Sequence, residues 1–218
     1  MRRKKENLLI MSCSIFYMIA IAGSRPLITL YASELGADHI EIGVIVAIYA
    51  LLPLMLSIYI GKLVDQFGKR TPLLLSVVLG FIALIIPVLL NNLIGVYISQ
   101  MIAGLGQIIF VIAFQSYVGR FSKKKLTDYY VSIFSIGMAV GHFIGPLISG
   151  LIADTVSYAQ SLAWLGIAII FMLPFIFFLD QREEKRRGAQ DKVDDKRGKS
   201  TEFLRNDALR QAFFISAI

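Results

Sequence analysis

A positive charge inside a long apolar stretch is the first candidate for chemistry in this sequence. Arg25 lies near the end of the apolar stretch at residues 8–30. An ionisable residue within a membrane span is costly and is typically kept for binding or coupling. Two interpretations of Arg25 stay open. Its side chain faces a cavity, where it pairs with an anionic group or orients Tyr17 or Gln100, or it extends to the outer membrane interface.

A histidine is the second candidate. His142 lies in the apolar stretch at residues 129–153, and an unperturbed imidazole titrates near neutral pH. It is either a proton carrier or a hydrogen-bonded packing residue. The sequence has two histidines and one cysteine, and it contains no hydrolase, metalloprotease or phosphate-binding motif. We therefore expect that the protein is not an enzyme, that it has no metal site or cofactor, and that this chain does not drive transport with ATP.

The short polar segment Gly61–Arg70, which reads GKLVDQFGKR, is the third candidate. Asp65 can pair with Lys69 or Arg70, and Asp128 is a second carboxylate for the same cations. Such a cluster would hold the inner ends of the spans together in one state and release them in another. The alternative is an ordinary positively charged loop with turn-forming Asp and Gly residues.

Six apolar stretches must position these residues. Hydrophobic residues make up 56% of the 218 residues and charged residues 17%, whereas soluble domains carry about a quarter charged residues. Each stretch can supply the roughly 20 apolar residues that cross a membrane; they lie at residues 8–30, 41–60, 72–90, 93–118, 129–153 and 160–179. This pattern excludes a soluble enzyme, a disordered tail and a nucleic-acid-binding domain. It predicts an all-α membrane protein.

A weak internal repeat predicts how the six spans are arranged. Gly61-x-x-x-Asp65 ends the second span at the inner face, and Gly150-x-x-x-Asp154 ends the fifth span at the outer face. Two three-helix units of opposite orientation are typical of secondary transporters. We therefore expect the six helices to form two inverted three-helix repeats.

Basic residues are distributed unevenly among the connections. The net charge is +7, and Lys and Arg precede the first span, lie between spans two and three and spans four and five, and follow span six. The outer connections near residues 34–40, 91–92 and 154–159 contain none. Because basic loops stay in the cytoplasm, we expect the N-terminus and residues 181–206 to be cytoplasmic.

Composition divides the chain into three segments. Residues 1–180 are expected to form the six-helix bundle, and residues 181–206 form a mixed-charge cytoplasmic linker. Residues 207–218 resemble the start of a seventh helix. Its apolar residues 212–218 would rise only about 10 Å as a helix, which is too short to cross a membrane. We therefore expect the chain to be a fragment or a truncated reading frame.

Two motifs give the chain a resemblance to the major facilitator superfamily. The family pattern between helices 2 and 3 is Gly-x-Leu-x-Asp-x-x-Gly followed by basic residues, and its matches here are Gly61, Leu63, Asp65, Gly68, Lys69 and Arg70. The helix 5 pattern Gly-x-x-x-Gly-Pro-x-x-Gly-Gly is matched by Gly141, Gly145, Pro146, Ser149 and Gly150, with Ser149 in place of one glycine. A helix 4 pattern is matched only in part, because Gln100 replaces the arginine that the family often uses in proton coupling.

The fifth stretch also carries a stripe of small residues. Gly137, Gly141, Gly145 and Ser149 recur every four residues, a spacing that lets two membrane helices approach closely. In the resembled family this helix packs against a second six-helix half. We therefore expect the stripe to face lipid or another chain where that half is absent.

The resemblance implies the N-terminal six-helix half of a secondary transporter in the cell membrane. The helix 5 pattern is typical of export-type members, so we expect proton-coupled efflux of a small amphiphilic molecule. The expected partners are the lipid bilayer, a small-molecule substrate, protons and the missing C-terminal half, and no nucleic acid. The alternatives are uptake of a sugar or other nutrient, and a truncated membrane protein that does not transport.

Overall fold

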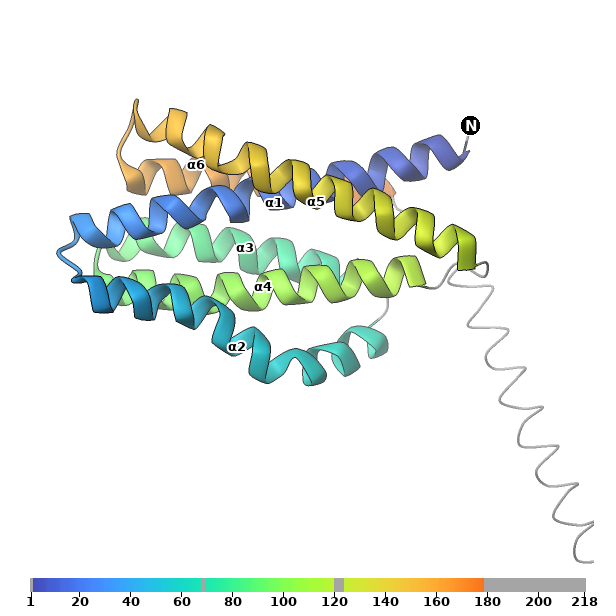
Figure 1. Ribbon diagram of the computed structural model, residues 1–218, viewed down its shortest axis with the longest axis horizontal. Coiled ribbons are helices and arrows are strands. Elements are labelled where there is room, and N and C mark those ends of the chain that lie inside the picture. The colour runs from blue at the N-terminus through green and yellow to red at the C-terminus, as the bar shows by residue number, and fades with distance from the viewer. Residues whose placement is uncertain (1, 68–69, 120–123, 179–218) are drawn as a thin grey trace, which may run out of the picture. The chain divides into compact units, whose positions relative to one another are not determined.

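Helices account for every element in the described part of the chain, which covers residues 2–67, 70–119 and 124–178 of a computed structural model (Figure 1). The helices are α1 (Arg2–Glu34), α2 (His39–Gln66), α3 (Arg70–Leu90), α4 (Leu93–Gly119), α5 (Lys124–Ala153), α6 (Tyr158–Ile170) and α7 (Leu173–Phe178). Six segments are long and apolar enough to cross a membrane, with α6 and α7 sharing the sixth. The prediction of an all-α protein with six spans is confirmed. The predicted linker at 181–206 and seventh helix at 207–218 lie outside the described residues.

The contacts between helices follow an inverted repeat. The contact between α1 and α5 corresponds to the contact between α4 and α2. The contact between α3 and α4 corresponds to the contact between α6 and α1. A pseudo-twofold operation that exchanges the first three helices for the last three converts each contact into its counterpart. The same operation leaves the observed contact between α3 and α6 unchanged. The arrangement agrees with two inverted three-helix repeats.

Polar side chains cap the helices at the end of the bundle opposite the N-terminus (Figure 1). The Asp38 carboxylate accepts a hydrogen bond from the Glu41 N–H at 2.7 Å, and the Glu41 carboxylate accepts one from the Asp38 N–H at 2.9 Å. This reciprocal capping box starts α2. The Asn92 side chain accepts a hydrogen bond from the Gly95 N–H at 2.8 Å at the start of α4. Acidic residues at the connection between α1 and α2 therefore have a structural role in starting α2.

α2 bends in its middle, and its C-terminal half turns away from α4 (Figure 1). The bend follows Pro53, whose ring has no N–H to donate and clashes with the preceding turn of the helix. α2 is also the most exposed of the six spans, with 6% of its central window buried. The bend leaves an opening between α2 and α4 at this level of the bundle.

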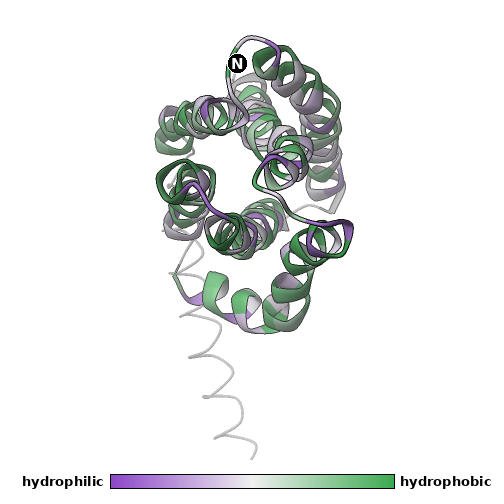
Figure 2. Ribbon diagram, turned by 90° about the vertical axis from the view of Figure 1, so that its left-hand side faces the viewer, coloured by the Kyte–Doolittle hydropathy of each residue, from purple (hydrophilic) through white to green (hydrophobic). Residues whose placement is uncertain are grey.

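Aromatic rings fill the centre of the bundle. The rings of Tyr17 and Phe110 are stacked with centroids 3.9 Å apart, and Phe114 stacks on Phe134 at 4.9 Å. All four side chains are buried, so these contacts join α1, α4 and α5. Many large hydrophobic side chains are also exposed on the outside, among them Leu54, Ile40 and Phe178. Figure 2 shows that hydrophobic residues occur along every helix of the bundle. The bundle is therefore apolar both inside and outside, as lipid requires.

Candidate functional site

An open cavity of about 400 Å³ lies between α1, α2 and α4. Its lining is mostly apolar, with polar groups from one residue of α1, two of α2 and one of α4. The lining residues are Arg25, Tyr49, Ala50, Pro53, Leu54, Ser57, Gly104, Gln107, Ile108 and Val111. A mostly apolar concave surface with a few convergent polar groups is typical of a small-molecule site. This cavity is the candidate functional site.

Arg25 provides the charge of the cavity. Its Nη2 donates a hydrogen bond to the Tyr49 hydroxyl at 3.2 Å and one to the Gln107 side-chain oxygen at 3.4 Å. The guanidinium carbon also lies 4.7 Å from the centroid of the Tyr49 ring, within range of a cation–π contact. Residues of two helices, Tyr49 on α2 and Gln107 on α4, therefore hold the arginine in the cavity.

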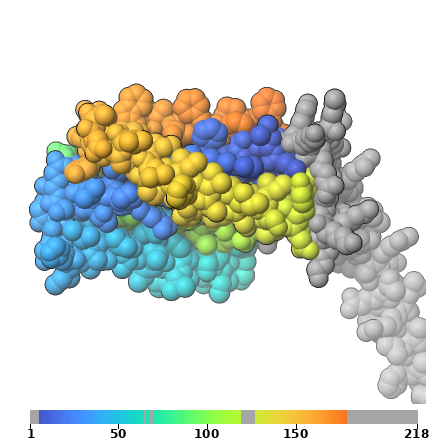
Figure 3. Space-filling model, turned by 45° about the horizontal axis from the view of Figure 1, so that its top comes forward, coloured from blue at the N-terminus to red at the C-terminus, as the bar shows by residue number. Residues whose placement is uncertain are grey.

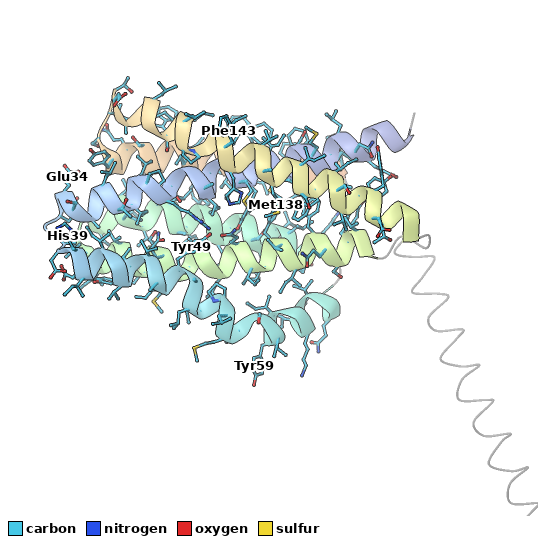
Figure 4. The ribbon with its side chains drawn as sticks, viewed as in Figure 1. Glu34, His39, Tyr49, Tyr59, Met138 and Phe143 are labelled. Atoms are coloured by element: carbon cyan, nitrogen blue, oxygen red, sulfur yellow. The ribbon has the colours of Figure 1, made fainter. Side chains whose placement is uncertain are left out.

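Tyr49 is positioned by a close approach of two helices. A Cβ atom added to Gly104 would overlap the carbonyl oxygen of Tyr49 and would lie 3.1 Å from the Pro53 ring. Only glycine allows α4 to lie this close to α2 one turn before the bend. Figure 4 shows Tyr49 on the bundle side of α2, whereas Tyr59, on the bent half, points away from the bundle.

The structure places the Arg25 side chain in contact with two neighbouring helices. The side chain lies in a cavity, and its hydrogen-bond partners are Tyr49 and Gln107. The expectation that it orients Tyr17 or Gln100 is wrong, because both residues are buried and neither lines the cavity. Sequence reasoning missed Gln107, although an amide within an apolar span was a signal that pointed to it.

His142 lies elsewhere, on the exposed side of α5. Its Nδ1 is 3.0 Å from the carbonyl oxygen of Met138, one turn earlier in the same helix. It is not among the residues that line the cavity. The structure therefore does not bring His142 and Arg25 together.

The small-residue stripe of α5 packs against α1. A Cβ atom added to Gly141 would lie 2.5 Å from the Cβ of Met18, and one added to Gly145 would lie 2.8 Å from the carbonyl oxygen of Ile19. Figure 3 shows α5 lying directly over α1. The expectation that the stripe faces lipid or another chain is wrong, because its closest contacts are made within this six-helix unit.

The other residues of the helix 5 motif lie at the edge of this contact. Gly137 also faces α1, and Ser149 is buried with its hydroxyl donating a hydrogen bond to the Pro146 carbonyl at 3.0 Å. Pro146 and Gly150 are exposed, and a Cβ atom added to Gly150 would meet nothing within 4 Å. Only part of the motif therefore supports close helix packing here.

The segment between α2 and α3 is described in part. Leu63 contributes to a second, apolar cavity of about 360 Å³ between the end of α2, the start of α3 and α4, and Gly61 has open space around it. Arg70 donates a hydrogen bond to the Phe177 carbonyl at 2.6 Å, which ties the start of α3 to α7. Asp128 is exposed at the start of α5. The expected pairing of Asp65 with the basic residues stays a prediction, because the Asp65 side chain, Gly68 and Lys69 lie outside the described residues.

No group of three or more His, Cys, Asp or Glu side chains that could hold a metal ion occurs in the described ranges. Cys13 is buried in α1, with no exposed surface. The chemistry of the candidate site therefore comes from one guanidinium, one phenol, one hydroxyl and one amide.

The sequence is similar to known membrane transporters. The family model described as the Major Facilitator Superfamily matches residues 10–218. An uncharacterized MFS-type transporter of Methanocaldococcus jannaschii is 24% identical over 91% of this chain and 52% of its own length. The class H tetracycline resistance protein of Pasteurella multocida is 23% identical over 85% of this chain and 46% of its own length.

The name of a third relative states that it is coupled to protons. The proton-coupled antiporter flippase LtaA of Staphylococcus aureus is 26% identical over 80% of this chain and 45% of its own length. The chain thus spans about half the length of the curated relatives it matches.

Proposed function

The chain belongs to the major facilitator superfamily and is an integral membrane protein, and we propose that the whole protein exports small amphiphilic molecules in exchange for protons. The observation that carries this proposal is the cavity between α1, α2 and α4, which combines an apolar wall with Arg25, Tyr49 and Gln107. Such a lining suits a molecule with an apolar body and one polar group.

Transport would proceed by alternating access. In this proposal the six described spans move as one body against a second six-helix unit, and the substrate lies between them near the middle of the membrane. The close contacts between α1 and α5 and between α2 and α4 favour rigid motion of each helix pair. The segment Gly61–Arg70 would lock the inner ends in one state, through Asp65 and the neighbouring cations.

Protons are the proposed driving ion. The name of the staphylococcal relative states proton coupling, and the names of the tetracycline and multidrug relatives state resistance. Gln100 cannot carry a proton as a charged residue would, so His142, exposed on α5, is the candidate carrier among the described spans. We place the protein in the cell membrane with its N-terminus and residues 181–206 in the cytoplasm.

Everted membrane vesicles from cells that express the full native gene product test this function. Three naphthalenes with one apolar body serve as probes: the 2-sulfonate anion, the neutral 2-sulfonamide and the 2-trimethylammonium cation. We expect the vesicles to accumulate at least one probe when an inside-acid gradient is imposed, and a protonophore to abolish the accumulation.

Vesicles without the protein are the control, and lactose tests the alternative of nutrient uptake. Accumulation that survives the protonophore would contradict proton coupling. Movement of lactose with none of the three naphthalenes would contradict the export of amphiphiles.

A further inference from the structure

Arg25 has no acidic partner among the described residues, although it lies within a membrane span. Resting on the function proposed above, we propose that the cavity selects amphiphiles that carry an anionic group, such as a carboxylate, sulfonate or phosphate, and that Arg25 binds this group. The substrate itself would supply the negative charge that the protein does not place beside the arginine.

The hydrogen bonds of Arg25 leave the guanidinium open on one side. Both bonds, to Tyr49 and to Gln107, are donated by the same nitrogen, Nη2. A guanidinium has five N–H donors in a planar fork, so Nε and Nη1 keep donors that no described residue accepts. One oxygen of an anion can accept from Nε or from Nη1, which point to different sides of the guanidinium. A bidentate pair with Nη2 would form when a second oxygen replaces the long 3.4 Å bond to Gln107.

The charges around the cavity favour an anion over a cation. The acidic residues with described side chains, which are Glu6, Glu34, Asp38, Glu41, Asp128 and Asp154, lie at or near the ends of the helices, and none lines the cavity. A cation within a membrane span is costly unless it is paired or faces water, and an anionic ligand would relieve that cost. A cationic ligand would instead meet the like charge of Arg25.

The rest of the lining fits an apolar body. Pro53, Leu54, Ile108 and Val111 supply apolar side chains beside the guanidinium. The Tyr49 ring covers one face of the arginine, and Gln107 holds it from α4. The arginine is thus fixed before the ligand arrives, which lowers the entropic cost of binding.

Equilibrium binding of the same three naphthalene probes to the purified native gene product in detergent tests this inference. We expect the sulfonate to bind at least about tenfold more tightly than the sulfonamide or the trimethylammonium compound. Arg25→Gln should remove this preference, and Arg25→Lys should retain part of it. His39→Gln changes an exposed residue at the start of α2 that lies outside the cavity, so it should leave the preference unchanged.

Three results would overturn the inference. They are equal or tighter binding of the cation, an unchanged sulfonate preference in Arg25→Gln, and no binding of any probe to monodisperse protein. Flux and binding separate the two proposals. Gradient-driven flux of the cation that persists in Arg25→Gln would keep the export function and refute the anion site. Arg25-dependent binding of the sulfonate without flux of any probe would keep the anion site and refute the export function.

Discussion

Single residues decide the geometry of the cavity, and Gly104 is the clearest case. Its missing side chain lets α4 contact the backbone of α2 at Tyr49, the residue whose ring and hydroxyl hold Arg25. Arg25 and Gln107 then close the cavity from α1 and α4. A membrane span thus keeps a charged residue because two neighbouring helices present a phenol and an amide to it.

At the residue scale we predict that Gly104→Ala destabilises the protein. The added Cβ would overlap the Tyr49 carbonyl oxygen, which is backbone and cannot rotate away. Overpacking of this kind costs about 1–3 kcal/mol. Thermal unfolding in detergent should show a lower Tm and weaker binding of naphthalene-2-sulfonate.

Gly43→Ala is the matched control, because a Cβ atom added there meets nothing within 4 Å. Alanine in an exposed helical position should leave the Tm unchanged or slightly raised. Equal Tm values for the two variants would contradict the assigned contact between α2 and α4.

At the scale of elements, paired helices form the rigid parts of the unit. α1 and α5 approach through Gly23, Gly141 and Gly145, while α2 and α4 approach through Gly104. The two pairs are counterparts in the inverted repeat. Each pair buries its contact through small residues, which suits van der Waals packing in a membrane.

Gly145→Ala and Gly150→Ala test the role of the helix 5 motif. Sequence reasoning treats both glycines as motif residues, but only Gly145 faces α1, where its added Cβ would lie 2.8 Å from a carbonyl oxygen. We expect Gly145→Ala to lower the Tm and the yield of monodisperse protein. Gly150→Ala should change neither. A larger loss for Gly150→Ala would mean that the motif packs on a surface outside the described unit.

At the scale of the whole molecule, the fold presents the cavity on one side of the unit and the charged connections at its ends. At the end that holds the N-terminus, Arg70 donates a hydrogen bond to the Phe177 carbonyl, and the Glu6 carboxylate accepts one from the Tyr130 hydroxyl at 2.5 Å. These bonds link α3 to α7 and α1 to α5. A structural change at this end of the unit would therefore move several helices together.

Asp65→Asn tests the gating role proposed for the inner segment. Because the amide keeps the shape and removes the charge, we expect membrane insertion to be retained and gradient-driven export to be lost. The control is Asp154→Asn, the equivalent position of the repeat at the outer end. Near-normal export by Asp65→Asn, measured in the same vesicles, would contradict the gate.

The sequence alone determined the six spans, the helical fold class and the family, and it singled out Arg25. Hydropathy, charge and motif spacing are properties of local sequence, so they can be read without knowledge of contacts. They also predicted the inverted repeats, although from only two matching positions.

Only the tertiary structure decided which partners each residue meets. Arg25 contacts Tyr49 and Gln107 rather than Tyr17 or Gln100, and the α5 stripe faces α1 rather than lipid or another chain. Both outcomes depend on the rotation of each helix about its axis. In a span that is apolar on all sides, hydropathy does not mark the face that packs inward, so these contacts follow from close packing between helices.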